Sequence, residues 1–348
     1  MVAHRGPPTL ALVTPEAALD RVVHCLDRMH DTGFRAKAFL RARDVVRSTD
    51  PAELAERAAA GALTKLDGIG DSSARVIVEA LDGGNPTYLN KLEQESQVSI
   101  TPDGARYREA LRGDCHTHST WSDGGASIEE MAGTAIALGH EYMVLTDHSA
   151  RLTIAHGLNR ERLEQQLDDL AEINETLGPF RILTGMEVDI LEDGSLDLAA
   201  DLLERLDVVV ASVHSKLRME RAAMTERMIL AVASPHVDIL GHCTGRMIGK
   251  RPPSTFDADY VFAACAQFGT AVEINCRPER LDPPRELLDK AIDFGCWFSI
   301  DSDAHATGQL EWQPHGCDRA AERSVPIERI INTMSADDLL AWTQQSAN

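Results

Sequence analysis

The stretch Asp114-Cys115-His116-Thr117-His118 begins a series of seven short apolar runs that end in residues able to bind a metal. The other six are Leu145–His148, Leu183–Glu187, Val209–His214, Ile239–His242, Ala271–Asn275 and Phe298–His305. Short runs rich in valine, isoleucine and leucine are typical of buried parallel strands. In a closed β/α barrel the catalytic side chains lie at the carboxyl ends of such strands. The order of these runs therefore predicts an enzyme with a metal site at the mouth of a barrel.

Nine side chains in or near these runs are candidate metal ligands. They are His116, His118, Asp123, His148, Glu187, His214, His242, Asp303 and His305. Residues two apart on a strand share a face, which applies to His116 with His118 and, we expect, to Asp303 with His305. One histidine at a strand end is more often a hydrogen-bonded core residue, and Asp123 alone also fits a turn. Burying so many polar groups is costly unless they are paired or bind metal, so the set favours zinc, manganese or iron.

The bulk composition limits the classes of function. The 348 residues suffice for a large core and more than one domain. Residues 1–113 hold 15 basic and 16 acidic residues, whereas the remainder holds 19 basic and 39 acidic ones. This balance does not favour a broad nucleic-acid-binding face, and any such contact must be local. No apolar stretch reaches the ~20 residues that cross a bilayer, and no signal peptide is evident. Seven scattered cysteines favour reduced thiols, and we expect a cytoplasmic protein without membrane contact.

The chain divides into four predicted segments. Residues 1–13 are expected to be disordered, and residues 14–90 to form a helical domain whose first helix is capped by Thr14 and begins at Pro15. Residues 91–111 are expected to be a linker around a short helix. Residues 112–348 alternate strands with helices, which predicts an α/β fold with a parallel sheet. The expected barrel helices are 127–138, 160–177, 198–206, 222–233, 257–268, 284–294 and 336–345.

The helical segment contains the turn Gly68-Ile69-Gly70 between two predicted helical stretches. Glycines permit close backbone approach, and free amides at the start of the second helix could bind phosphate. From spacing alone, DNA binding by Gly68, Ile69 and Gly70 and an ordinary helical hairpin are equally supported.

The barrel segment resembles a known family in its motifs. The blocks His116-Thr117-His118-Ser119, Trp121-Ser122-Asp123-Gly124, Thr146-Asp147-His148, Ser212-Val213-His214-Ser215 and Asp303-Ala304-His305, with Glu187 and Gly241-His242, resemble the PHP phosphoesterases from about Arg112 to the end. The resemblance implies a distorted seven-stranded β/α barrel that uses three divalent ions, manganese or zinc with iron as an option, to activate water.

The same resemblance implies how the nine ligands divide. One ion would be held by His116, His118, Glu187 and Asp303, a second by Glu187, His214 and His242, and a third by Asp123, His148 and His305. Glu187 would bridge two ions. Many relatives have histidine at the position of Asp123, and aspartate should favour harder ions such as manganese.

Two further regions resemble bacterial family X DNA polymerases. The blocks Gly241–Arg246 and Glu273–Asp282 match that branch of the family, with Cys243 replacing a proline. Residues from Gly33 through the Gly68–Gly70 turn resemble the small helix-hairpin-helix domain that begins those polymerases. The polymerase core is missing from between the two parts. The helix after the turn, residues 73–79, has no lysine, so we do not expect lyase activity.

The sequence therefore predicts a phosphate-ester hydrolase that acts on DNA. We expect a metal-dependent 3′→5′ exonuclease of DNA repair, monomeric, with DNA ends or gaps as its partner. Lys216, Arg246 and Arg277 follow strand ends and are candidates to complement phosphate charge beside Glu187. One alternative is a phosphatase of small molecules such as histidinol phosphate or nucleotides. Another is a non-catalytic DNA-repair scaffold.

Overall fold

A computed structural model describes residues 13–31 and 33–346 of the chain, and its internal contacts divide the chain into two compact units at Gln97. The first unit is helical and the second is an α/β barrel. The start predicted to be disordered, residues 1–13, lies outside the described residues except for Val13, which packs against the helical core.

The helical unit is built from five α-helices around one apolar core. They are α1 (Pro15–Arg28), α2 (Phe34–Ser48), α3 (Pro51–Ala59), α4 (Asp71–Leu81) and α5 (Thr87–Glu95). The Thr14 hydroxyl accepts a hydrogen bond from the Ala17 amide, and the Asp50 carboxylate accepts one from the Ala52 amide at 2.9 Å. These caps satisfy amides that a helix leaves free at its start. The core includes Leu19, Leu26, Phe39, Ile77 and Leu89.

The segment predicted as a linker, 91–111, is mostly helix. It begins inside α5, whose Leu89 and Leu92 lie in the helical core, and it contains α6 (Pro102–Ala110). In the second unit α6 packs against α13 (Gln313–Glu322). The amide and hydroxyl of Thr101 both donate to the Asp318 carboxylate, at 2.9 and 2.6 Å. The short helix expected within this segment is α6, but its packing against a partner about 200 residues further along the chain was not predicted.

The Gly68–Gly70 turn differs from the predicted hairpin. Its first arm is one turn of 3-10 helix, η1 (Leu63–Lys65), rather than an α-helix. Only Gly68 has a left-handed backbone (φ +95°), and the Ile69 side chain is buried in the core. The amides of Ile69 and Gly70 already donate to the Leu66 carbonyl and the Ser73 hydroxyl, at 3.2 and 3.0 Å. Two of the three turn amides are therefore already hydrogen-bonded within the chain.

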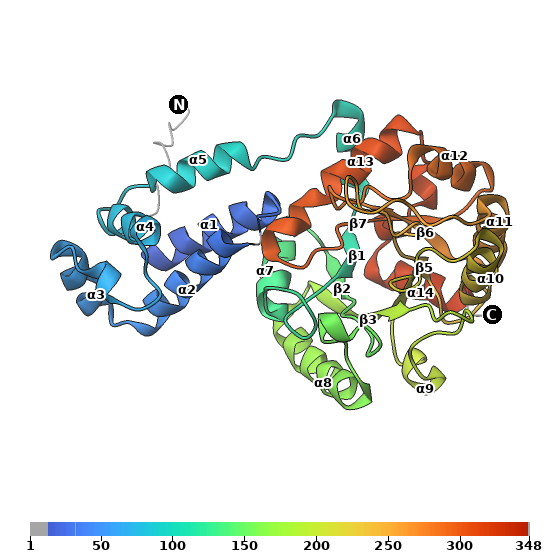
Figure 1. Ribbon diagram of the computed structural model, residues 1–348, viewed down its shortest axis with the longest axis horizontal. Helices are drawn as coiled ribbons and strands as arrows, with labels where there is room; N and C mark the ends of the chain where they lie inside the picture. The colour runs from blue at the N-terminus through green and yellow to red at the C-terminus, as the bar shows by residue number, and fades with distance from the viewer. Residues whose placement is uncertain (1–12, 32, 347–348) are drawn as a thin grey trace, which may run out of the picture. The chain divides into compact units, whose positions relative to one another are not determined.

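Seven parallel strands form the barrel unit in chain order (Figure 1). They are β1 (Gly113–Thr117), β2 (Tyr142–Leu145), β3 (Arg181–Asp189), β4 (Val208–Ser212), β5 (Ile239–Leu240), β6 (Ala271–Asn275) and β7 (Phe298–Asp301). The first and last strands meet through the bridge of Thr117 with Ala304 and a 2.8 Å bond from the His118 amide to the Ala304 carbonyl. The fold is thus the predicted α/β class, a nearly closed seven-stranded barrel.

The seven predicted barrel helices are present. They are α7 (Ile128–Ala137), α8 (Arg160–Leu177), α9 (Ala200–Leu203), α10 (Arg221–Val232), α11 (Ala258–Phe268), α12 (Arg285–Asp293) and α14 (Ala336–Ser346). Four 3-10 turns, η2 (Thr153–Ala155), η3 (Thr307–Trp312), η4 (Ile327–Arg329) and η5 (Ile331–Thr333), complete the unit. The sequence did not predict α13. Its Gly316 breaks the helical pattern, and the structure gives the reason: a Cβ there would lie 2.4 Å from the Cys276 sulfur.

Two further findings concern the whole described chain. None of its described helices combines the length and apolar character needed to span a bilayer. All seven cysteines are buried, and none of them forms a disulfide with another.

Candidate metal centre

The carboxyl ends of the seven strands bring the nine predicted ligands together at one end of the barrel. His116 lies in β1 and Glu187 in β3, whereas the other seven follow strands within loops. All except Asp123, His214 and His305 are almost fully buried. The sheet therefore places side chains from six strand ends around one point, as the sequence predicted.

Glu187 lies at the centre of this cluster. Its Oε1 is 2.9 Å from His242 Nε2 and 3.2 Å from His214 Nε2. Its Oε2 is 2.9 Å from His148 Nδ1 and 3.3 Å from His116 Nε2. Each oxygen thus faces imidazole nitrogens from two different strands, which is the arrangement that a carboxylate bridging two ions requires.

Three groups of ligand atoms lie within 4.8 Å of one another among the described residues. They are His118, Asp123, His148 and His305; His116, His118 and Asp303; and His148, Glu187 and His214. These groups share most of their members with the predicted division. His118 and His148 each belong to two groups, and His242 joins the cluster through Glu187 rather than through a group of its own.

The cluster leaves its polar atoms without hydrogen bonds. His116 Nε2, both nitrogens of His118, both nitrogens of His214 and both oxygens of Glu187 are buried and have no hydrogen-bond partner. Some of these atoms lie 2.9 to 3.6 Å from a nitrogen or oxygen of a neighbouring ligand, but not in hydrogen-bond geometry. A buried polar atom without a partner costs about 1–3 kcal/mol. Divalent ions bound by imidazole and carboxylate would supply the missing partners, so the residues fit such ions.

Charges within the cluster also suit metal binding. Burial raises the pKa of Glu187, but His214, His116 and His148 outweigh it and hold the pKa well below its usual range. Burial lowers the pKa of His148 and of His242. The carboxylate therefore stays ionised and these two imidazoles stay neutral, and these are the forms that bind a metal. Burial opposes a rise for His116 and His214, but Glu187 outweighs it and raises the pKa of both, that of His214 to about 9, so an ion would have to displace a proton from each.

Glu273 is a site residue that the sequence analysis missed. Its Oε1 lies 2.6 Å from His116 Nδ1, and its Oε2 accepts hydrogen bonds from the His242 amide and from the Asn275 side chain. A proton on Nδ1 leaves His116 Nε2 free to face Glu187 and an ion. The Asn275 amide also donates to Asp303 Oδ2 at 3.1 Å. The available signal was an acidic residue in the middle of a buried apolar run.

Asp147 organises the loop that carries Asp123. It accepts hydrogen bonds from the Ser119 amide at 2.8 Å, the Ser119 hydroxyl at 2.7 Å and the Gln166 side chain at 2.7 Å. Because its oxygens are occupied in this way, Asp147 orients the loop and does not join the ligand cluster.

Asp303 and His305 lie in the loop after β7 and not, as predicted, on one face of the strand. The strand ends at Asp301, and Asp303 has a left-handed backbone (φ +53°), so the two residues do not share a strand face. Their side chains still meet, with His305 Nδ1 3.5 Å from Asp303 Oδ1. His305 Nε2 and His148 Nε2 each lie 3.4 Å from Asp123 Oδ1 at the open rim.

The predicted cations occupy three different settings. Arg277 lies 3.1 Å from His305 Nδ1 and pairs with Glu279. Arg246 donates from Nε to the Arg280 carbonyl at 2.7 Å, so its guanidinium holds a loop. Lys216 is exposed and lies 3.9 Å from Glu192.

Arg280 is the other residue that the sequence analysis missed. Its Nε lies 3.2 Å from Asp303 Oδ2, and its Nε and Nη1 are buried without a hydrogen-bond partner. Arg280 lies in the block Glu273–Asp282, which also contains the predicted Arg277. Residue type alone could not show which of these two arginines lies nearer the site.

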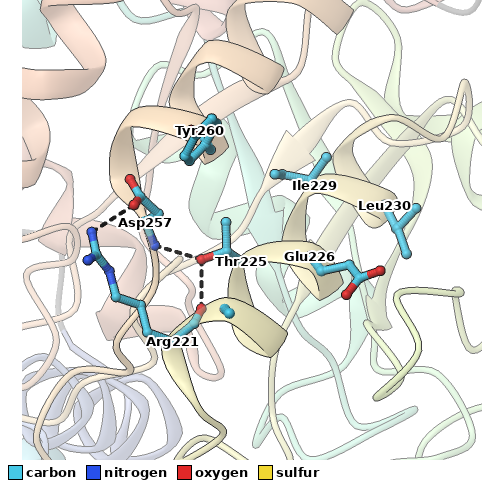
Figure 2. A pocket seen from close by; sticks show the side chains of 8 residues that line it. Arg221, Thr225, Glu226, Ile229, Leu230, Asp257 and Tyr260 are labelled. Atoms are coloured by element: carbon cyan, nitrogen blue, oxygen red, sulfur yellow. Dashed lines mark hydrogen bonds and ion pairs between the residues drawn. The ribbon is translucent and has the colours of Figure 1, made fainter.

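A separate cavity of about 510 Å³ lies between α10 and α11 and contains none of the predicted site residues (Figure 2). Its lining is mostly apolar and includes Ile229, Leu230 and Tyr260, with an ion pair of 2.8 Å between Arg221 and Asp257 at one side. It offers no cluster of ligands or bases, so we place the chemistry at the metal centre.

Comparison with known proteins identifies the class to which this barrel and site belong. The PHP domain model matches residues 114–275, the part of the chain that holds seven of the nine ligands. A probable phosphatase of Thermoanaerobacter sp. (strain X514) is 31% identical over 208 residues, which are 56% of this chain and 79% of that protein. The chain belongs to the PHP family and is a metal-dependent phosphoester hydrolase.

A second relative extends the similarity along the chain. The DNA polymerase/3′-5′ exonuclease PolX of Bacillus subtilis (strain 168) is 39% identical over 236 residues, or 68% of this chain. This chain spans only 41% of that protein's length. Among solved structures, a Lactococcus lactis histidinol phosphate phosphatase complexed with zinc, L-histidinol and phosphate aligns at 17% identity with a TM-score of 0.43, covering 61% of this chain and 94% of that chain.

Proposed function

We propose that this PHP hydrolase cleaves phosphodiester bonds of DNA as a 3′→5′ exonuclease. The observation that carries the proposal is the nine-residue cluster around Glu187 in a chain that is 39% identical to a polymerase/exonuclease over 68% of its length. The similarity covers 236 residues, more than the matched domain alone.

The cluster would hold three divalent ions, manganese or zinc. His116, His118 and Asp303 would hold one, His214 and His242 a second, and Asp123, His148 and His305 the third, with Glu187 bridging the first two. Bound ions lower the pKa of water and neutralise charge on phosphate oxygens. Elemental analysis of purified protein tests the number and identity of the ions.

The surrounding residues prepare this site for a phosphate. Glu273 and Asn275 fix the orientation of His116 and Asp303. Arg277 and Arg280 place two guanidinium groups beside Asp303, at 3.5 and 3.2 Å. Arginine presents paired donors that match phosphate oxygens, so these two residues would orient the scissile phosphate.

The helical unit would dock the DNA through the start of α4. The amides of Asp71 and Ser72 begin this helix, and helix starts favour phosphate. Gly70 provides a clean test, because a Cβ there meets nothing within 4 Å and its backbone is not left-handed. Gly70→Leu should keep the fold but weaken DNA binding several-fold by blocking close approach. Gly84→Leu, also at an exposed glycine, is the matched control.

The decisive experiment is a substrate panel with the metal-loaded full chain. End-labelled single-stranded, duplex, gapped and 3′-phosphate DNA are compared with phosphomonoesters, each with manganese, zinc and magnesium. We expect stepwise shortening from the 3′ end of DNA. Endonucleolytic products, or shortening from the 5′ end, would contradict the proposed polarity.

A small-molecule phosphatase is the second candidate. It is favoured by the probable phosphatase relative, of which this chain covers 79%. In the same panel this function predicts release of phosphate from monoesters with no shortening of DNA.

A further inference from the structure

The loops around the mouth of the barrel differ in charge. The three loops that follow β4, β5 and β6, residues 216–221, 245–253 and 277–280, contain eight lysines and arginines and two glutamates. The loops that follow β1, β2 and β3, residues 118–127, 146–159 and 190–199, contain one arginine and five acidic residues. We call the first three loops the basic rim. It holds eight of the 19 cations of residues 114–348, in a region with 39 acidic residues.

The loops of the basic rim are joined to one another. The Ser254 hydroxyl donates to the Leu217 carbonyl at 2.9 Å, and the Ile248 amide donates to the Glu279 carbonyl at 2.6 Å. Two hollows of about 420 and 320 Å³ lie along these loops and share Arg251 and the two prolines that follow it. The three loops therefore form one continuous surface rather than three separate tips.

Four cations of the rim have no acidic partner within 4.0 Å among the described residues. They are Arg218, Arg246, Lys250 and Arg251. In contrast, Arg221 pairs with Asp257, and Arg277 pairs with Glu279. Burial and then the neighbouring Arg280 lower the pKa of Arg251, so like charges crowd together at the rim. An anion bound along the rim would relieve this repulsion.

The loop after β5 carries an exposed apolar residue among these charges. Met247 and Arg251 pair across a tight turn, with Gly249 in a left-handed conformation (φ +73°). The turn exposes half of Ile248 (51%), next to the exposed Lys250. An apolar side chain beside cations suits a polymer that has sugars and bases between its phosphates.

We propose that the basic rim binds the sugar–phosphate backbone of a single nucleic-acid strand and leads its end into the metal centre. Arg218, Lys250 and Arg251 contact phosphates, and Ile248 packs against a sugar or base. The proposal rests on the proposed function, because it supplies the path by which the scissile end of a strand reaches the ions. It assigns strand binding to the barrel in addition to the turn of the helical unit.

The test measures binding of a fluorescent single-stranded oligodeoxynucleotide to the metal-loaded full chain over a range of salt concentrations. Phosphorothioate linkages at its 3′ end prevent shortening. The variant Arg218→Gln/Lys250→Gln removes two cations whose side chains make no hydrogen bond or ion pair with another described residue. The control Arg160→Gln/Arg205→Gln makes the same change of charge at exposed arginines that pair with Glu164.

We expect the rim variant to bind roughly tenfold more weakly, with a salt slope shallower by about 1.4, as for two phosphate contacts on a single strand. The control should change neither value. Ile248→Ser should weaken binding by a smaller factor that does not depend on salt. An oligonucleotide with a neutral methylphosphonate backbone should not distinguish the rim variant from the unchanged protein.

Equal affinity and slope for the rim variant and the unchanged protein would overturn the proposal. So would anionic lipid vesicles that bind the rim as tightly as the oligonucleotide does. Shortening of the same strand without phosphorothioates is measured separately. If the strand is shortened but the rim variant binds as tightly as the unchanged protein, the role of the rim is contradicted and the exonuclease function is not. If the rim variant binds more weakly but the strand is not shortened, the exonuclease function is contradicted and the role of the rim is not.

Discussion

The helical unit and the barrel unit bury polar groups in opposite ways. The core of the helical unit is apolar, with Asp27, Ser73 and Ser96 as its buried polar residues in the described part of the chain. The barrel buries a continuous group of histidines and carboxylates, many without hydrogen bonds. The difference shows that apolar packing is sufficient for the first unit, whereas the second is completed only when something binds its polar centre. Four predictions, given from the largest expected effect to the smallest, test this difference between the two units.

Glu187→Ala should lower the rate of hydrolysis of every substrate by at least ~10³-fold, because this single change would remove a ligand from two ions. Steady-state rates are measured beside metal content and circular dichroism. Glu192→Ala removes a glutamate that is exposed at the surface and should leave the rate unchanged. Near-normal activity of a folded Glu187→Ala protein would show that the cluster is not the catalytic centre.

Removal of the ions should destabilise the barrel and spare the helical unit. Ions present at 10² to 10³ times their dissociation constant stabilise a folded protein by about 3–4 kcal/mol. Hydrogen exchange followed by peptide, with and without chelator, resolves the two units within one chain. We expect faster exchange in β3 and β4 and unchanged exchange in α1 and α4. Equal effects in both units would remove the basis of the contrast.

Asp27 is the exception in the helical unit and should make its stability depend on pH. Burial raises the pKa of Asp27 to about 7, although His24 and Arg43 oppose this shift. Since the folded pKa exceeds the unfolded one, the contribution of Asp27 is full below about pH 4 and is lost as pH rises through about 7. Asp27→Asn should therefore stabilise α1 by roughly 2–3 kcal/mol at pH 8 and not at pH 4. Exchange of α1 amides, corrected for intrinsic rates, measures this difference, and Asp82→Asn, at an exposed aspartate of the same unit, is the control.

Glu273→Gln should weaken metal binding by about 10–100-fold, because the amide no longer holds the His116 ring as firmly as the carboxylate does. Competition with a calibrated chelator gives the affinity directly. Glu286→Gln changes an exposed glutamate on α12 and should bind metal normally. Unaltered affinity in Glu273→Gln would mean that the ring is positioned by packing alone.

The strands, and the gathering of the candidate ligands at one end of the barrel, were predictable because both follow local rules. Short apolar runs formed strands, and strand ends placed His116, Glu187, His214 and His242 at one point, as barrel geometry requires. The candidate ligands could therefore be predicted from the order of the strands along the chain, without knowledge of contacts between distant residues.

What the sequence did not predict depends on contacts between distant residues. The α6 and α13 helices pack against each other although they lie about 200 residues apart in the chain, and this pairing was not predicted. Glu273 and Arg280 could not be ranked above their neighbours without the distances to His116 and Asp303. The Gly68–Gly70 turn had the expected glycines, but local hydrogen bonds of Ile69 and Gly70 had already used two amides.

The meeting of β1 with β7 has a consequence for the synthesis of the protein. The helical unit has its own core and is complete once Gln97 leaves the ribosome. In contrast, the Cys115 amide donates a hydrogen bond to the Asp301 carboxylate, and α6 cannot pack until α13 has been synthesised. At about 5–20 residues per second, the nascent barrel spends roughly 10–40 s with its first strand unpaired on that side. During that interval its apolar strands are exposed, so the growing chain should depend on chaperones far more in its second part than in its first.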